Sequence, residues 1–332
     1  MKEGTYSVTP IWGDVIPGNS SRSKLDDMTI DYDADPQKNQ LKFALYIGKY
    51  TGKWYFDRKK NIDTTTWLNA IKPGLVEETY TDVPAIVPFL CEGADRAVII
   101  IPGGGFAFTG DVTAKDQEES DKLAKRLNDR GISAFILDYR FNPYKFPFPL
   151  LDLQRAIRYV RYHAQEYGLN PNKIGLLGGS AGGYMVAGFL NLPAGTNQFP
   201  LGYVPDEVDA VDDSVCNGGM FYPALSLKWN MGCLYTTAPL EVIRDRKLRR
   251  EFIERTDLSN RIVDTKTPQF IAHGNKDMLV DHKGSRLYVK NLEAAGGDIR
   301  YIEVEGANHI FTNHPEYAWV FDEYLTWLDE HF

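Results

Sequence analysis

A short glycine-rich segment constrains this chain more than any other feature of its sequence. Gly178-Gly179-Ser180-Ala181-Gly182 fits the pattern G-x-S-x-G and directly follows an apolar run at 174–177. Between a strand and a helix, this pattern forms a sharp, strained turn that exposes the serine hydroxyl at the top of a sheet. So tight a turn leaves room only for very small residues, which explains the glycines. The pattern also suits a turn that packs or binds phosphate, so Ser180 needs further support as a nucleophile.

A second glycine-rich segment follows an earlier apolar run. The run at 97–101 ends in Pro102-Gly103-Gly104-Gly105-Phe106. A serine acyl-transfer enzyme aims N–H groups at the developing oxyanion, usually from the residue after the nucleophile and from a loop after an earlier strand. A flexible turn is the alternative interpretation of the glycines. The predicted oxyanion donors are the N–H groups of Gly104, Gly105 and Ala181, and the predicted walls of an acyl pocket are Phe106 and Phe108.

Two segments after Ser180 supply a candidate acid and a candidate base. Residues 268–277 read as a short strand whose following loop carries Asp277, and residues 302–309 read as a strand followed by His309. The order serine, aspartate, histidine is that of α/β-hydrolases and differs from the orders in the chymotrypsin and subtilisin folds. We therefore predict a triad of Ser180 as nucleophile, Asp277 as acid and His309 as base.

Other residues compete for these roles. His314 is the alternative base, and Asp281 is the alternative acid. His273 ends a strand just before a glycine, where we expect a structural hydrogen bond. Glu305 precedes the histidine loop and is expected to face solvent, so it is not a candidate acid.

The wider pattern resembles a known family. Beyond the three motifs, the matching stretches are 138–140 (Asp-Tyr-Arg), 152–161, 221–223 (Phe-Tyr-Pro), 273–280 and 306–311. With these, the chain resembles the α/β-hydrolases of the acetyl xylan esterase and feruloyl esterase-like branch, whose oxyanion motif reads P-G-G-G. The resemblance covers residues 85–330 well and 5–30 loosely. It departs from the family at Ile310, where a glycine is usual, and at residues 40–80, which look like an insertion.

This resemblance implies a fold and an activity. The expected fold is one α/β-hydrolase domain over residues 1–332, with an N-terminal extension at about 1–84 and a small cap insertion at about 224–262. The expected activity is that of a serine carboxylesterase acting on acetyl or hydroxycinnamoyl esters of plant cell-wall carbohydrates, without a metal or organic cofactor. A serine peptidase of the same fold and a non-catalytic binding protein on this scaffold are the alternatives.

Alternating helical and strand patterns support a mostly parallel sheet with helices on both faces. The spacing predicts helices over 118–130, 150–167 and 315–328 and a buried strand over 132–137, whereas residues 1–30 read as a loop packed over the domain. In such sheets ligands bind beyond the carboxyl ends of the strands, where all three triad candidates fall.

Net charge and cysteine content limit which partners and metal sites the chain can be expected to have. The net charge of −8, from 37 basic and 45 acidic residues, argues against nucleic acid or an anionic membrane as the main partner. Three cysteines without a C-x-x-C pattern indicate neither a disulfide framework nor a zinc site. Without an apolar leader or a run of transmembrane length, we expect a cytoplasmic protein. The expected ligand is a small-molecule or oligosaccharide ester.

Overall fold

A mixed sheet forms the centre of the protein. The structure, a computed structural model, describes residues 8–19, 83–106, 117–141, 144–192 and 197–332. Within these residues the sheet has eight strands in the order β1-β2-β4-β3-β5-β6-β7-β8; β2 pairs antiparallel with both β1 and β4, and all other pairs are parallel. The strands are β1 (Thr9–Pro10), β2 (Ala85–Phe89), β3 (Ala97–Ile101), β4 (Ser133–Asp138), β5 (Ile174–Gly179), β6 (Gly218–Phe221), β7 (Gln269–Gly274) and β8 (Ile299–Val304).

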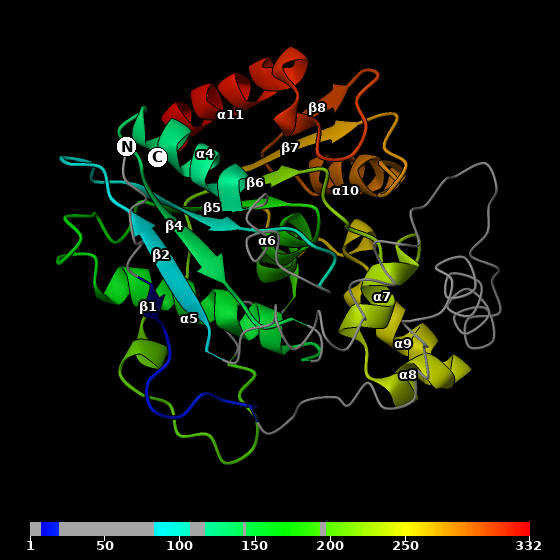
Figure 1. Cartoon of the computed structure of the whole chain (residues 1–332). Helices are drawn as coiled ribbons and strands as arrows, with labels where there is room; N and C mark the ends of the chain where they lie inside the picture. The colour runs from blue at the N-terminus through cyan, green and yellow to red at the C-terminus, as the bar shows by residue number, and fades with distance from the viewer. Residues whose placement is uncertain (1–7, 20–82, 107–116, 142–143, 193–196) are drawn as a thin grey trace, which may run out of the picture.

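Helices cover both faces of this sheet (Figure 1). One face carries α5, α6 and α10, and the other carries α4 and α11. The mostly parallel sheet expected from the alternating pattern is confirmed, and so is the α/β-hydrolase fold that the resemblance implies. The helices are α4 (Gln117–Asn128), α5 (Phe148–Tyr162), α6 (Ala181–Asn191), α7 (Met231–Thr237), α8 (Leu240–Arg244), α9 (Arg246–Thr256), α10 (Lys283–Ala294) and α11 (Ala318–Glu330), with short 3-10 turns at η2 (Val208–Ala210), η3 (Leu258–Asn260), η4 (Phe311–Asn313) and η5 (Pro315–Tyr317).

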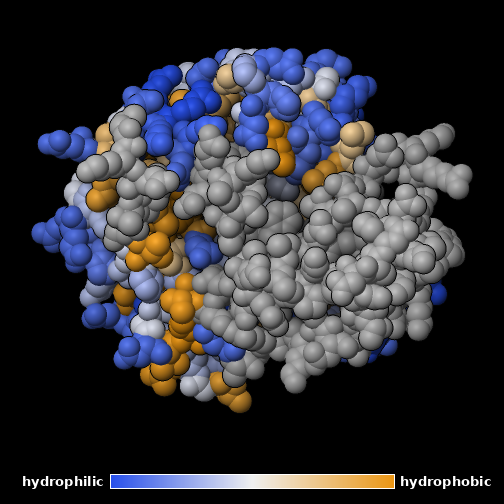
Figure 2. Space-filling view, in the orientation of Figure 1, coloured by the Kyte–Doolittle hydropathy of each residue, from blue (hydrophilic) through white to orange (hydrophobic). Residues whose placement is uncertain are grey.

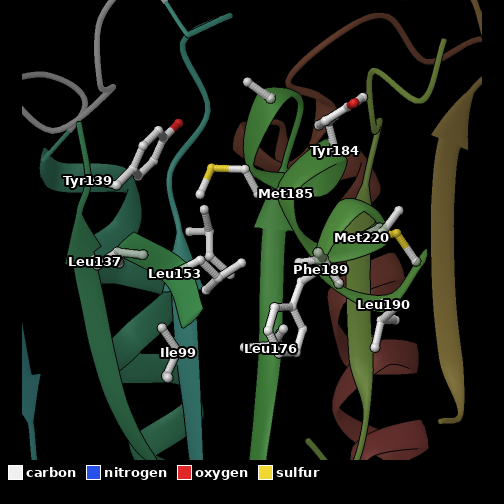
Figure 3. Packing of buried hydrophobic residues seen from close by; sticks show 14 of the residues in the cluster. Ile99, Leu137, Tyr139, Leu153, Leu176, Tyr184, Met185, Phe189, Leu190 and Met220 are labelled. Carbon is white, nitrogen blue, oxygen red and sulfur yellow. The ribbon is translucent and has the colours of Figure 1, made fainter. Parts of the chain in front are cut away.

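The burial of strand β3 explains its continuously apolar sequence. All five of its residues are buried, because helices cover both of its faces. Ile99 and Ile101 pack into the core cluster under α5 and α6, whereas Val98 and Ile100 pack into the cluster under α4 and α11. Figure 3 shows the first of these clusters, in which Ile99 lies among side chains from neighbouring strands and from α5 and α6.

The outer surfaces of α4 and α11 are polar. On the exposed side, Arg126 of α4 pairs with Asp322 of α11 at 2.6 Å, and Arg130, just after α4, pairs with Asp329 of α11 at 3.0 Å. Figure 2 shows mostly hydrophilic residues in the upper part of this view, where Figure 1 places the two helices. Exposed pairs of this kind contribute little stability, so buried apolar contacts provide most of the helix–sheet attachment.

A buried ion pair helps to hold residues 8–19 against the domain. Arg140 lies just after β4, and its Nη2 is 2.6 Å from Oδ1 of Asp152 in α5. Both side chains are fully buried. The indole N–H of Trp12 donates to the same carboxylate at 2.9 Å, and Arg140 also donates to the carbonyl oxygen of Pro17 at 2.6 Å. Residues 8–19 are therefore held against the domain by polar contacts in its interior.

The boundaries of some predicted elements were wrong. The helix expected over 150–167 ends at Tyr162, because the chain then tightens into turns with hydrogen bonds from Ala164 N to Arg161 O and from Gly168 N to Gln165 O. Residues 9–10 were expected in a loop, yet they pair with β2 as an edge strand. The apparent insertion at 40–80 lies outside the described residues.

No helix in the described ranges is long and apolar enough to cross a membrane. The cytoplasmic location stays a prediction.

Asp138, at the end of β4, gives the fold a testable pH dependence. Burial, with the nearby charge of Asp152, raises the pKa of the Asp138 carboxyl to about 7. The folded protein therefore keeps a proton that the unfolded chain releases at about pH 4, and stability is lost as the pH rises from about 4 towards 7. We expect the free energy of unfolding of Asp138→Asn, relative to the parent, to increase steadily over this interval.

Urea denaturation at a series of pH values between about 4 and 8 measures this difference. The matched control is the exposed Asp129→Asn, whose difference from the parent should stay flat. A flat difference for Asp138→Asn as well would contradict the prediction.

Candidate functional site

The turn between β5 and α6 places Ser180 at the carboxyl end of the sheet. Ser180 has φ 54° and ψ −114°, a backbone conformation that is strained for a residue with a side chain. The neighbouring glycines permit it. A Cβ on Gly178 would lie 2.3 Å from the backbone of Gly182, and a Cβ on Gly182 would lie 2.0 Å from the carbonyl oxygen of Ile101. The segment is thus the tight strand–turn–helix that its sequence predicts.

One histidine connects this serine to an aspartate. His309 Nε2 lies 3.1 Å from Ser180 Oγ, and His309 Nδ1 lies 2.7 Å from Asp277 Oδ2. The three residues come from the ends of β5, β7 and β8, which parallel pairing brings to one edge of the sheet. Nδ1 donates to the carboxylate, which leaves Nε2 as the acceptor for the serine hydroxyl. The structure therefore brings all three predicted triad residues together.

The carboxylate of Asp277 is held by donors on both of its oxygens. Oδ1 accepts the N–H groups of Leu279 at 2.9 Å and Val280 at 2.8 Å, and Oδ2 accepts from His309. His273 Nε2 also reaches Oδ2, at 3.1 Å. Burial by itself would raise the pKa of the Asp277 carboxyl, but the hydrogen bonds from His273 and His309 outweigh burial and hold the pKa well below its usual range. Asp277 is therefore ionised near neutral pH.

Neighbouring side chains restrain the ring and the loop of His309. Tyr222 packs edge-on against this ring, with centroids 4.7 Å apart, and its hydroxyl forms a hydrogen bond of 3.1 Å with Thr312 Oγ1. The side chain of Asn308 accepts the N–H of Met278 at 3.0 Å, which ties the histidine loop to the aspartate loop. These contacts leave the imidazole little freedom to turn away from Ser180.

Ile310 follows His309 and adopts an unusual backbone conformation. Its φ of 57° and ψ of 35° lie in the left-handed region, where a β-branched residue is rare. The glycine usual in the resembling family would adopt this conformation without strain. The chain therefore keeps the backbone geometry of the family at this position while adding an apolar side chain that is 42% exposed.

The triple-glycine loop after β3 lies directly beside the turn that carries Ser180. A Cβ on Gly103 would lie 3.2 Å from the Cβ of Ser180, so these two backbones are in close contact. Gly104 and Gly105 have φ values of 113° and 62°, which strongly favour glycine. Ala181 begins α6, so its N–H belongs to the electropositive end of that helix. The predicted oxyanion residues thus come from the two segments that border the serine.

The helices between β6 and β7 contact this loop. Thr236 in α7 donates its hydroxyl to the carbonyl oxygen of Gly105 at 2.7 Å, and the carbonyl of Thr237 accepts the N–H of Phe146 at 3.0 Å. Further along, the hydroxyl of Tyr184 in α6 donates to the carbonyl of Thr256, at the end of α9, at 2.7 Å. These helices, which fall in the predicted cap region at about 224–262, are therefore anchored beside the Ser180 turn.

Of the two phenylalanines predicted to wall an acyl pocket, the structure describes only Phe106. Phe106 is 1% exposed and packs edge-on between Phe146 and Tyr184, with ring centroids 5.3 Å and 5.7 Å away. It thus supports the loop from within, and a contact with substrate stays a prediction. Phe108 lies outside the described residues.

The competing candidates lie elsewhere. The ring of His314 packs against Tyr317, with centroids 6.4 Å apart. Asp281 accepts the N–H of Lys283 at the start of α10, and Glu305 is exposed beside Asn275. Among the residues that the structure describes, no group of three or more histidine, cysteine or acidic side chains could hold a metal ion.

Two contacts of this site were missed by sequence reasoning. The packing of Tyr222 on His309 was not predicted, although Tyr222 belongs to a stretch that resembles the family. The structural hydrogen bond expected for His273 is present, but its partners, Asp277 and Ser285, were not foreseen. The four-residue spacing from His273 to Asp277 was the only signal for the first of these partners.

Several known proteins are similar to this chain over part or most of its length. The family model described as BD-FAE matches residues 87–200. The acetylxylan esterase of Xylanibacter ruminicola is 35% identical over 101 residues, which are 30% of this chain and 20% of that protein. An acetyl ester-xyloside bifunctional hydrolase from Caldicellulosiruptor lactoaceticus superposes with a TM-score of 0.65 at 24% identity, over 98% of this chain and 96% of that one. The chain therefore has the α/β-hydrolase fold, and over part of its length it is similar to an acetylxylan esterase.

A further relative of this α/β-hydrolase matches a longer stretch. The esterase LipQ of Mycobacterium tuberculosis is 27% identical over 231 residues, which are 68% of this chain and 52% of that protein. The chain thus spans a fifth to about half of the length of these two curated relatives. The structural match, at less than 25% identity, shows the fold alone.

Close packing at Gly182 gives a prediction for this α/β-hydrolase. In Gly182→Ala the new methyl group would meet the carbonyl oxygen of Ile101 at 2.0 Å, so the turn and the loop after β3 must separate. Overpacking of this kind costs about 1–3 kcal/mol, and we expect the free energy of unfolding to fall by at least this amount. Urea denaturation followed by circular dichroism measures the change.

The control is Gly93→Ala, in a surface turn where no atom lies within 4 Å of the added methyl group. Gly93 has a φ of 79° and Gly182 has no positive φ, so any loss in the control reports backbone strain without a collision. Equal losses of stability in the two variants would contradict the packing argument.

Proposed function

We propose that this protein is a serine carboxylesterase that hydrolyses acetyl or hydroxycinnamoyl esters, with esters of plant cell-wall carbohydrates as its substrates. The observation that carries the proposal is the hydrogen-bonded connection of His309 to Ser180 at 3.1 Å and to Asp277 at 2.7 Å. This is the arrangement in which a base activates a hydroxyl and a carboxylate orients the base.

The first half of the reaction forms an acyl-enzyme. Ser180 Oγ attacks the carbonyl carbon of the ester while His309 Nε2 takes the hydroxyl proton. Asp277 keeps Nδ1 protonated and stabilises the resulting imidazolium. The N–H groups of Gly104, Gly105 and Ala181 bind the oxyanion, and each such donor contributes about 2.7–4 kcal/mol to the transition state. As the carbon–oxygen bond of the ester breaks, the departing alcohol receives the proton from Nε2.

The second half releases the acid. A water molecule takes the place of the alcohol, gives a proton to His309 Nε2 and attacks the acyl carbon. The tetrahedral intermediate collapses, Ser180 Oγ leaves and recovers the proton, and the carboxylic acid departs. No step requires a metal ion or an organic cofactor.

The substrate class rests on resemblance to relatives. The Xylanibacter ruminicola relative is named an acetylxylan esterase, and the matching Caldicellulosiruptor lactoaceticus structure is described as an acetyl ester-xyloside hydrolase. Both names support an acetyl group on a xylose-containing saccharide as the first ester to test. The described helices from α7 to α9, anchored beside the triple-glycine loop, would limit the size of the bound ester.

The proposal is tested with p-nitrophenyl acetate, butyrate and octanoate, followed by acetylated xylan and feruloylated saccharides. We expect turnover of the short esters with an initial burst of p-nitrophenolate equal to the enzyme concentration. In Ser180→Ala this turnover should fall by about 10³-fold or more, since the nucleophile is lost.

Ser214→Ala is the matched control, because Ser214 is an exposed serine remote in sequence from the triad, and it should keep parental turnover. Ester hydrolysis that survives in Ser180→Ala, or no hydrolysis by the parent, would contradict the proposal. Cleavage of aminoacyl-arylamides instead of esters would identify a peptidase, and binding without turnover would identify a non-catalytic protein.

A further inference from the structure

A second histidine contacts the carboxylate that orients His309. His273 lies near the end of β7 and is completely buried. Its Nε2 is 3.1 Å from Asp277 Oδ2, the oxygen that also accepts from His309 at 2.7 Å. One carboxylate oxygen therefore has two imidazole neighbours, of which only His309 reaches Ser180.

The neighbours of His273 determine where its proton lies. Nε2 faces two acceptors, Asp277 Oδ2 at 3.1 Å and the carbonyl oxygen of Val280 at 3.3 Å, so Nε2 must carry a hydrogen. Nδ1 lies 2.7 Å from the hydroxyl of Ser285, which is buried in the first turn of α10. In the neutral ring the Ser285 hydroxyl donates to Nδ1. A continuous chain of hydrogen bonds thus runs from α10 through His273, Asp277 and His309 to Ser180.

This chain completes the set of donors around Asp277. Two backbone N–H groups hold Oδ1, and the two histidines hold Oδ2. Without His273, Oδ2 would keep one donor, and the resistance of the carboxylate to rotation about its bond to Cβ would decrease. The charge on Oδ2 would also be shared with one imidazole instead of two.

We propose that His273 is a positioning residue, which holds Asp277 Oδ2 in the direction of His309 and takes part of the charge of that oxygen. This inference rests on the proposed function for its consequence in catalysis. The contact between His273 and Asp277 does not itself depend on the identity of the substrate.

Other charged groups near His273 must stay unchanged in a test. His282, at the start of α10, has its ring centroid 6.3 Å from that of His273. Glu303 lies opposite His273 on β8 and pairs with Arg286 of α10 at 2.5 Å. Asp281 belongs to the same loop as Asp277. None of these side chains is altered in the variants below.

The experiment compares His273→Leu, His273→Gln and Ser285→Ala. Leucine fills much of the ring volume but donates no hydrogen bond, whereas the amide nitrogen of glutamine can replace Nε2. In His273→Leu we expect kcat for p-nitrophenyl acetate to fall about 10- to 100-fold, with KM changed by less than about twofold. Because more charge stays on Oδ2, His309 should hold its proton to higher pH, and the acidic limb of the kcat profile should move to higher pH.

The other variants give graded results. His273→Gln should recover most of kcat and return the acidic limb towards its parental position. Ser285→Ala should give a smaller change in the same direction, because the ring keeps its contact with Asp277. The surface variant His163→Gln is the matched control and should leave both quantities at parental values.

A second measurement needs no substrate. The Nδ1 proton of His309 can be followed by NMR as a downfield resonance. In His273→Leu this resonance should move further downfield, since Oδ2 becomes a stronger acceptor for His309, and it should return in His273→Gln. Circular dichroism and thermal unfolding of each variant establish that it is folded. The resonance therefore tests His273 even where the ester assay fails.

The proposal is overturned by either of two results. The first is a folded His273→Leu protein with parental kcat, pH profile and His309 resonance. The second is an equal loss of kcat in His273→Leu and His273→Gln without movement of the resonance, which would show that the ring serves packing alone. Loss of the ester reaction in the parent, with the expected shift of the resonance, would contradict the proposed function and leave the role of His273 supported.

Discussion

The strained backbone of Ser180 is the constraint on which the site depends. A serine with φ 54° is stable only when the surrounding chain fixes the turn from several sides. Gly178 and Gly182 allow the strand and the helix to touch at this turn, and the backbone of Ile101 closes over it. The buried strands on both sides of β5 therefore hold the serine in place, and the conformational cost of the turn is offset by the core as a whole.

Parallel pairing of the strands brings the other groups of the site next to this turn. Because β5, β6, β7 and β8 run in the same direction, the loops that follow them meet at one edge of the sheet. Each loop contributes a different chemical group: a hydroxyl from Ser180, the Tyr222 ring, a carboxylate from Asp277 and an imidazole from His309. The hydrogen bond between Asn308 and Met278 joins two of the loops directly, so their groups are held at a fixed separation.

The sequence predicted the residues of this site better than their surroundings. Ser180, Asp277 and His309 could be recognised because their order and their positions after apolar strands reflect the chain path of the fold. The contact between His273 and Asp277 was marked only by a four-residue spacing, which does not give the course of the short loop between them. The early end of α5 was missed for a similar reason, because i to i−3 hydrogen bonds after Tyr162 leave no clear mark in the apolar spacing. The sequence thus predicted the order of strands and site residues, but it did not predict the geometry of individual loops.

In the proposed reaction, the hydrogen bond from Thr236 to the carbonyl of Gly105 would link the recognition of substrates to the rate of their conversion. This bond fixes the orientation of the peptide group that follows Gly105, so α7 and the oxyanion loop form one mechanical unit. A bulky ester group that displaced α7 would therefore also displace the backbone proposed to bind the oxyanion. Discrimination by size would then be expressed as slow turnover of a bound ligand, and tight binding alone would be a poor guide to the preferred substrate.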